Sequence, residues 1–404
     1  RDDLVTGVQT CALPICEILS EVEAATGTRP AIVYVFARED RLETILTTPG
    51  EKPIYRSTRV PRGELLRAVD NLRSNLIVSR LRILGRHTTY GKQLYDWAIA
   101  PMLDELEAQG IDTLLFALDS GLRGLPLAAL YDGDRYLVED FAIGLMPSLN
   151  LVDLRPRDLS GLPALAMGAS EFTELSQLPA VPYEVDIVGQ LSGGTSFLNE
   201  EFTQDRLVKQ RQQSPLDLLA NPASIFGNPL SVFQGESSLP ILHLATHAQF
   251  LEGSIDNSYI QLWDGKIFLN EIRDLGLHDP PLELLVLSAC QTAVGNEEAE
   301  LGFAGIAVKA GIKTAIASLW YVSDTGTLGL MSQFYPQLQD APTRAMALQR
   351  AQVAMLRGEV RIENGAIVGL GEPLPLPEEL AGLPDTELSH PYYWSAFTAI
   401  GSPW

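Results

Sequence analysis

Two apolar runs of the sequence each end in a side chain that can take part in nucleophilic chemistry. Ile241-Leu-His-Leu-Ala-Thr-His247 ends in an imidazole, and Leu284-Leu-Val-Leu-Ser-Ala-Cys290 ends in a thiol. An imidazole beside a thiol can take its proton, or can pair with the thiolate and lower the thiol pKa, and both arrangements give a nucleophile at neutral pH. Backbone N–H groups in the turn after Cys290 could stabilise an oxyanion, a role that needs donors but no particular side chain.

Both runs have the composition of buried strands. The near-continuous apolar segments Ile241–Ala245 and Leu284–Ala289 are typical of parallel strands whose two faces are covered. Expected strands alternate with expected helices such as Val181–Leu191, and this alternation predicts a doubly wound parallel sheet. We also expect a helix at Tyr90–Gln109 and a last strand at Tyr393–Ile400. Ligands bind at the carboxyl ends of such strands, so the imidazole and the thiol share one edge if their strands are neighbours.

Structural interpretations of the same residues stay open. A lone cysteine at the end of an apolar strand is often a small core residue, and a histidine in that place is often structural. His243 and His247 are spaced i, i+4, but on a strand they lie roughly 13 Å apart, which is too far for one metal ion. We therefore predict a buried, hydrogen-bonded His243 and no metal site. His87, His278 and His390 receive no role.

The charge of the chain limits its partners. The net charge is −22, with 29 basic and 51 acidic residues. No basic stripe is available to neutralise phosphates, so we expect no nucleic-acid partner. The same balance argues against anionic membrane surfaces, and no run reaches the roughly eighteen apolar residues that a membrane span needs.

The N-terminal segment 1–16 resembles the translation of a sequencing adapter, most clearly over Val5–Ile15. We exclude it from the expected fold, as one excludes a tag, and expect the true N-terminus to be missing. Cys11 lies inside this segment and Cys16 at its end, which leaves Cys290 as the securely native cysteine. A disulfide framework is then not expected, which fits a reducing, cytoplasmic compartment.

Several ordered motifs resemble the CHAT-domain family, caspase-like peptidase modules that are related to separases and often follow tetratricopeptide repeats. The resemblance covers residues from about Arg29 to the end. The motifs are Leu122-Arg-Gly-Leu-Pro-Leu-Ala-Ala-Leu130, His243-Leu-Ala-Thr-His247, Leu287-Ser-Ala-Cys-Gln-Thr292, Ala317-Ser-Leu-Trp320 with Asp324, and His390-Pro-Tyr-Tyr-Trp394 leading into Ile400-Gly401.

The resemblance implies a fold, a domain plan and a reaction. The fold would be a caspase-like three-layer α/β/α sandwich at 161–404, preceded at 17–160 by a mixed α/β, pseudo-peptidase-like lobe. His247 would act as general base and Cys290 as nucleophile in the hydrolysis of a protein substrate, without metal or cofactor. The oxyanion would be bound by backbone N–H groups of Ala248 and Cys290. Many relatives have glycine where this chain has Ala248, so a left-handed backbone there would be strained.

Caspase-like folds also indicate which loops form the pocket for the residue before the cleaved bond. On our strand assignment these loops hold Glu171, Ser288 and Asp324. A buried carboxylate there would favour Arg or Lys in the substrate. Asp324 has a structural alternative, because it could cap a helix that begins near Thr325.

Two other functions remain open at the level of sequence. The first is a catalytically silent scaffold whose partners lie in upstream tetratricopeptide repeats. The second is another Cys/His amidohydrolase, such as a glutaminase. Replacement of Cys290 by alanine separates an enzyme from a scaffold, and an Arg-based electrophilic peptide separates a peptidase from a glutaminase.

Overall fold

The computed structural model describes residues 15–147, 152–212, 239–249, 257–277, 281–288, 305, 307–308, 310–369, 371–376 and 378–404. They divide into two units. The first contains the described part of Arg1–Asp158 together with Pro342–Gln349 and Thr398–Trp404, and the second contains Leu159–Ala341 and Arg350–Phe397. The boundary between the units after Asp158 lies close to the expected boundary at 160. However, Pro342–Gln349 and Thr398–Trp404, which we expected in the C-terminal lobe, belong to the first unit.

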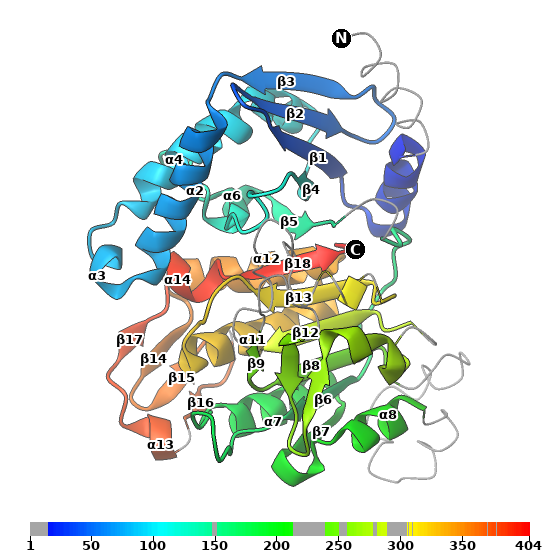
Figure 1. Ribbon diagram of the computed structural model, residues 1–404, viewed down its shortest axis with the longest axis vertical. Helices are drawn as coiled ribbons and strands as arrows, with labels where there is room; N and C mark the ends of the chain where they lie inside the picture. Colours follow the sequence, from blue (N-terminus) through cyan, green and yellow to red (C-terminus); the bar gives the residue numbers. More distant parts are fainter. Residues whose placement is uncertain are drawn as a thin grey trace. The chain divides into compact units, whose positions relative to one another are not determined.

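The sheet of the first unit has the strand order β3-β2-β1-β4-β5-β18 (Figure 1). Its strands are β1 (Pro30–Ala37), β2 (Leu42–Thr47), β3 (Ile54–Thr58), β4 (Thr113–Leu118), β5 (Ala142–Leu145) and β18 (Phe397–Gly401). The first three form an antiparallel meander, whereas β1, β4, β5 and β18 are parallel. Gly50, with φ 69°, supplies the left-handed residue in the turn between β2 and β3.

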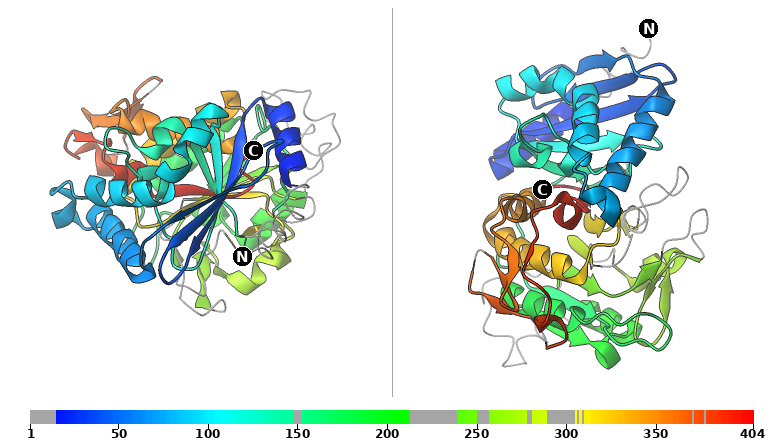
Figure 2. Two further views of the ribbon diagram at one scale, coloured as in Figure 1. Left: turned by 90° about the horizontal axis from the view of Figure 1, so that it is seen from above. Right: turned by 90° about the vertical axis from the view of Figure 1, so that its left-hand side faces the viewer.

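Helices cover both faces of this sheet. Figure 2 shows the helix at 15–26 on one side and α2 with α4 on the other. The helices are α2 (Arg62–Ile77), α3 (Ser79–Arg82), α4 (His87–Ala98), α5 (Leu103–Ala108) and α6 (Leu137–Asp140), with 3-10 turns η1 (Ala100–Met102) and η2 (Leu127–Ala129). The expected single helix Tyr90–Gln109 is wrong, because Pro101 lacks an N–H and splits it into α4, η1 and α5.

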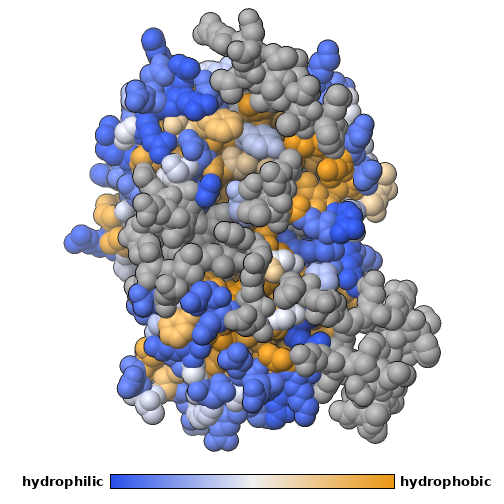
Figure 3. Space-filling view, turned by 45° about the vertical axis from the view of Figure 1, so that its right-hand side comes forward, coloured by the Kyte–Doolittle hydropathy of each residue, from blue (hydrophilic) through white to orange (hydrophobic). Residues whose placement is uncertain are grey.

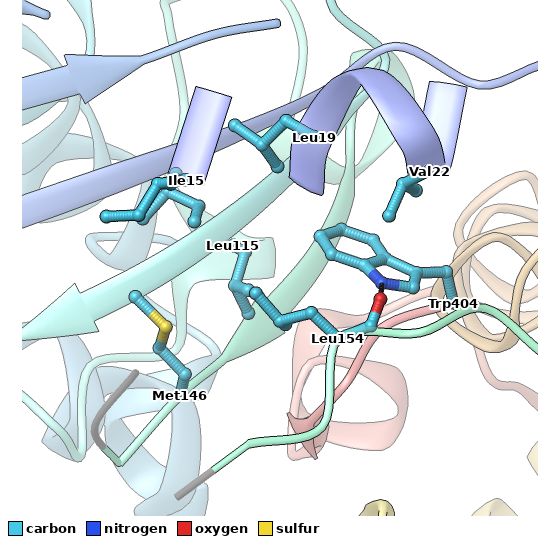
Figure 4. Packing of buried hydrophobic residues seen from close by; sticks show 8 residues of the cluster. Ile15, Leu19, Val22, Leu115, Met146, Leu154 and Trp404 are labelled. Atoms are coloured by element: carbon cyan, nitrogen blue, oxygen red, sulfur yellow. Dashed lines mark hydrogen bonds between the residues drawn. The ribbon is translucent and has the colours of Figure 1, made fainter. Parts of the chain in front are cut away.

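A hydrophobic cluster in the core of the first unit contains residues from the N-terminal helix at 15–26 and the C-terminal residue Trp404 (Figure 4). Leu19 and Val22 of the 15–26 helix are fully buried against Leu115 of β4 and against Trp404. The Trp404 indole N–H donates to the Leu154 carbonyl. Ile15 and Cys16, the end of the suspected adapter segment, are also buried in this unit, whereas residues 1–14 lie outside the described part.

The sheet of the second unit is parallel throughout its described order, β13-β12-β8-β6-β7. The strands are β6 (Ala164–Gly168), β7 (Thr195–Leu198), β8 (Ile241–Ala245), β12 (Leu284–Ser288) and β13 (Thr314–Ser318). Every residue of β6, β8, β12 and β13 is buried, as the apolar runs predict for strands covered on both faces. The expected parallel sheet is therefore confirmed, and β8 and β12 are neighbours.

The longer helices of the second unit are α7 (Val181–Ser192), α8 (Gln204–Gln212) and α11 (Asp324–Asp340), and α12 (Arg344–Leu356) contributes residues to both units. Shorter elements are α13 (Glu378–Ala381), α14 (Pro391–Trp394), η4 (Asn199–Glu201) and η8 (Leu269–Leu275). Two small sheets complete it: β9 (Ala248–Gln249), β10 (Tyr259–Gln261) and β11 (Lys266–Phe268), and β14 (Arg361–Glu363), β15 (Ala366–Val368), β16 (Leu374–Pro375) and β17 (Thr386–Glu387).

The expected last strand Tyr393–Ile400 begins too early. Residues Pro391–Trp394 form α14, and the strand runs from Phe397 to Gly401. Pro391 occupies the first helical position, where its missing N–H costs nothing. His390, for which we predicted no role, caps this helix: its Nδ1 accepts a hydrogen bond of 3.1 Å from the Tyr392 N–H.

A glycine sets the distance between α7 and the sheet. A Cβ atom on Gly168, at the end of β6, would lie 2.5 Å from the Ala245 carbonyl oxygen and 2.8 Å from methyl groups of Val181 and Val185. Only a residue without a side chain allows this approach. Gly168 therefore fixes where α7 and its side chains lie over the carboxyl ends of the strands.

On the face shown in Figure 3, hydrophobic side chains reach the surface between hydrophilic ones. The exposed large hydrophobic residues include Ile83 (88% exposed), Leu84 and Tyr321. Within the described part of the chain, no helix combines the length and the apolar character that a membrane crossing requires.

Candidate active site

The register between β8 and β12 pairs the residues that stand two places before His247 and two places before Cys290 in the sequence. Ala245 pairs with Ser288 in the parallel ladder, and His247 and Cys290 each lie two residues further along their chains. A hydrogen bond of 3.3 Å from the Thr246 N–H to the Ser288 carbonyl continues the ladder beyond the last paired residues. Cys290 itself lies outside the described residues, so the contact between thiol and imidazole stays a prediction.

The imidazole of His247 is held by a backbone carbonyl. Its Nε2 atom lies 2.8 Å from the Ser176 carbonyl oxygen, and its ring centroid lies 4.8 Å from that of Phe172. A carbonyl can only accept, so Nε2 must carry the proton and, in the neutral ring, the lone pair is on Nδ1. Nδ1 is therefore the atom that can receive a proton from a thiol.

The loop that carries the Ser176 carbonyl is fastened at several points. The Gln177 side chain exchanges two hydrogen bonds with the backbone of Phe172, at 3.1 and 2.8 Å. The Leu178 N–H donates to the Ser170 carbonyl at 2.9 Å. These bonds limit the movement of the carbonyl and hence of the His247 ring.

Ala248, the predicted oxyanion residue next to the histidine, lies in extended backbone. It forms β9, where it pairs with Ile260. Among the described residues, left-handed backbone outside glycine occurs at Asn199 and Asn364 and not at Ala248. The strain considered for this departure from the family pattern is therefore absent, while the role of the Ala248 N–H stays a prediction.

A pocket opens beside these strand ends and contains two of the three predicted specificity residues. Ser288 and Asp324 both line it, together with Thr246, Ser318 and Tyr321 from the strand ends and loops and Glu184 from α7. The full described lining is Leu178, Ala180, Val181, Glu184, Thr246, Ser288, Ser318, Tyr321, Val322, Asp324, Thr327 and Phe397.

The structural alternative for Asp324 is wrong. Helix α11 begins at Asp324 itself, and its cap is Ser323, whose Oγ accepts a 3.3 Å hydrogen bond from the Gly326 N–H. The carboxylate of Asp324 is therefore not used for capping. Its one hydrogen bond from a side chain that the structure describes is a long one, 3.5 Å from the Tyr321 hydroxyl.

The third predicted residue, Glu171, is not brought to the pocket. Its side chain is exposed, and its Oε1 accepts a 3.4 Å hydrogen bond from the Asn199 amide. The acidic side chain that α7 contributes in its place is Glu184, which sequence reasoning missed. A signal existed, because Glu184 lies at helical spacing from Val181 and Val188 on the apolar stripe of the helix, where a carboxylate is out of place.

Behind the pocket, Glu184 belongs to a buried polar chain. Glu184 is 3% exposed, and its Oε1 lies 3.2 Å from Nε2 of the fully buried His243. The other ring nitrogen of His243 is 3.0 Å from the Tyr335 hydroxyl of α11. The prediction of a buried, hydrogen-bonded His243 is confirmed.

Burial and charge raise the pKa values of two side chains, Asp324 in the pocket lining and Tyr335 beside His243. Burial raises the pKa of Asp324, and the negative charge of Glu184 raises it further, against smaller lowering effects of the Tyr321 hydroxyl and of a positive charge on His247. Burial, followed by the charge of Glu184, raises the pKa of Tyr335 well above its ordinary value.

Over the part of the chain that the structure describes, no three His, Cys, Asp or Glu side chains converge as metal ligands would. His278, one of the histidines without a predicted role, lies outside that part. His87 is buried, with its Nε2 3.1 Å from the Tyr136 hydroxyl.

Comparisons with known proteins agree with this architecture. A family model described as the CHAT domain matches residues 88–402. No curated protein matches the chain in sequence. Among solved structures, Saccharomyces cerevisiae separase in complex with securin is similar, with a TM-score of 0.53 at 10% identity over 98% of this chain.

Two further structures are similar to lesser degrees. A second structure of the yeast separase–securin complex gives a TM-score of 0.50 at 9% identity over 99% of this chain. The complex of the pro- and mature domains of Porphyromonas gingivalis RgpB gives 0.39 at 11% identity, over 83% of this chain and 71% of that one. This chain spans 31% of the separase chain in both separase structures. The predicted caspase-like fold class is confirmed.

Proposed function

The chain belongs to the CHAT-domain family, and from this premise we propose that it is a cysteine endopeptidase that cleaves a protein substrate after Arg or Lys. The observation that carries the proposal is the pairing of Ala245 with Ser288 in two neighbouring parallel strands, since His247 and Cys290 each follow two residues later in the sequence. The hydrogen bond from His247 to the Ser176 carbonyl supports it, because it directs the lone pair of the imidazole to Nδ1.

In the proposed reaction, Nδ1 of His247 takes the thiol proton of Cys290, and the sulfur attacks the carbonyl carbon of the substrate amide. The oxyanion that forms accepts hydrogen bonds from the backbone N–H groups of Ala248 and Cys290. The imidazolium then gives its proton to the leaving amine, which departs and leaves a thioester. A water molecule passes a proton to His247 and attacks the thioester, which releases the carboxylic acid and restores the thiol.

The proposed preference for Arg or Lys before the cleaved bond of the substrate rests on Asp324. Its carboxyl group lines the pocket beside the strand ends, is not used to cap α11, and is half-buried. A half-buried carboxylate in a pocket favours a ligand that supplies a positive charge.

We further propose that this peptidase acts with protein partners. The yeast separase that the chain resembles in fold is seen in complex with securin. A protein regulator, or tetratricopeptide repeats upstream, would be the corresponding partner in the cytoplasm.

The experiment treats the full chain with a peptide that ends in an arginyl electrophile and locates the adduct by mass spectrometry. We expect alkylation at Cys290 and its loss in His247→Ala. Cys16→Ala serves as a matched control, because Cys16 is a buried thiol of the first unit. Its replacement should leave the labelling unchanged. Absence of an adduct at Cys290, or cleavage of arginyl peptides that survives Cys290→Ala, refutes the proposal. Labelling by a glutamine analogue in preference to the arginyl one indicates an amidohydrolase instead.

A further inference from the structure

A carboxylate buried on the apolar face of α7 requires an explanation. Glu184 is 3% exposed, and its neighbours on that face are Val181, Val185 and Val188. Removing an ionised carboxylate from water costs several kcal/mol unless a cation or hydrogen bonds compensate. An aliphatic residue would serve the packing of the helix better, so the carboxyl group itself is needed.

Within the protein, Glu184 is only partly compensated. The one ion-pair distance it makes to a described residue is the 3.2 Å to Nε2 of His243, and neither atom reaches hydrogen-bond geometry with a described partner. The other nitrogen of His243 is occupied by the Tyr335 hydroxyl. The imidazole therefore fixes the position of the carboxylate from behind and leaves its hydrogen-bonding capacity incomplete.

Besides its contact with His243, Glu184 borders the pocket. Glu184 lines it from α7 and Asp324 lines it from the first residue of α11. Because both residues line the same pocket, the charge of Glu184 raises the pKa of Asp324. Two carboxylates on one small pocket are costly as long as no cation lies between them.

We propose that Glu184 is a specificity-determining residue, which with Asp324 forms a site for a guanidinium group. This inference rests on the proposed function and narrows it from basic substrates to arginyl ones. A guanidinium is planar and carries five N–H donors in a fork, so it can bond to carboxylates on two different elements at once. The ammonium of lysine is a compact charge that cannot span both in the same way.

The test measures binding without turnover. The chain of 404 residues with Cys290→Ala is titrated by calorimetry with peptides whose C-terminal residue is arginine amide, lysine amide or citrulline amide. We expect the arginyl peptide to bind at least about 10-fold more tightly than the lysyl and citrullinyl peptides. Glu184→Gln should weaken the arginyl peptide by about 10- to 100-fold, since a hydrogen bond to a charged group contributes roughly 1.5–3 kcal/mol. It should also bring the arginyl and lysyl affinities close together.

Asp186→Asn is the matched control. It makes the same kind of change on the same helix, but Asp186 is exposed and accepts a hydrogen bond from Gln190. Its affinities should equal those of the parent. If Glu184→Gln retains the parent's affinity and its preference for arginine, the inference is refuted.

Two further outcomes keep the test decisive. Should Glu184→Gln fail to fold, as judged by its thermal unfolding, the parent alone decides, because equal binding of arginyl and lysyl peptides contradicts a two-carboxylate site. Should the wild-type chain bind arginyl peptides selectively yet fail to react at Cys290, the site stands and the peptidase proposal falls.

Discussion

Replacing Gly168 by alanine tests how α7 is positioned over the sheet. The added Cβ would lie 2.5 Å from the Ala245 carbonyl oxygen and 2.8 Å from Val181 and Val185 methyl groups. Favourable contacts between carbon atoms lie at about 3.5–4.0 Å, so α7 must move away from β6. The carbonyl belongs to the central strand β8, which cannot yield easily.

We expect Gly168→Ala to destabilise the protein by about 1–3 kcal/mol, as overpacking of a core does. For a domain of roughly 150–250 residues this corresponds to a fall in Tm of about 2–12 °C. Thermal unfolding followed by tryptophan fluorescence measures it. The affinity for an arginyl peptide should fall as well, because the movement of α7 carries Glu184 with it.

Gly265→Ala is the control for this experiment. A Cβ at Gly265 would meet no atom within 4 Å, and its φ is not in the left-handed region. Its Tm should stay close to that of the wild type, since exposed substitutions usually change stability by less than about 0.5 kcal/mol. Equal Tm values for the two variants would show that the tight approach of α7 has no energetic importance.

Three other predictions concern the residues around the pocket. Ser323→Ala removes the cap of α11 and should cost about 1 kcal/mol of stability, measured by thermal unfolding; a larger loss in Asp324→Asn would mean that the cap is misassigned. Tyr335→Phe leaves a buried nitrogen of His243 without its 3.0 Å partner and should cost about 1–3 kcal/mol, and an unchanged Tm would contradict this. Because burial raises the folded pKa of Asp324, the folded state binds more protons than the unfolded one between about pH 4 and that raised pKa, so stability falls as pH rises through this window. The Tm of Asp324→Asn should therefore rise relative to that of the wild type as pH increases through the same window. A relative rise confined to acid pH would contradict a raised pKa of Asp324.

The parts of the fold that sequence patterns predicted are those that depend on burial. Continuous apolar runs gave β8 and β12 correctly, and their carboxyl ends gave the position of the candidate site. Local exceptions were harder. Pro101 divides a helix that periodicity alone joins, and Pro391 begins a helix where the aromatic residues that follow suggest a strand.

The sequence could propose those residues of the candidate site whose side chains carry the chemistry. His247 and Asp324 carry chemistry that is visible in the sequence, whereas the carbonyl of Ser176 is a main-chain atom that any residue could supply. Glu171 and Glu184 are both glutamates after β6, and only the three-dimensional path of the loop and α7 decides which one faces the pocket. Composition cannot make that distinction.

The bond from His247 to Ser176 has an evolutionary consequence. Since the ring is aligned by a peptide carbonyl, mutations that merely exchange the Ser176 side chain should drift neutrally. Insertions or deletions between Ser170 and Leu178 would displace the carbonyl and misalign the ring. Selection is then expected to act on the length of this loop more strongly than on the identity of the residue at position 176.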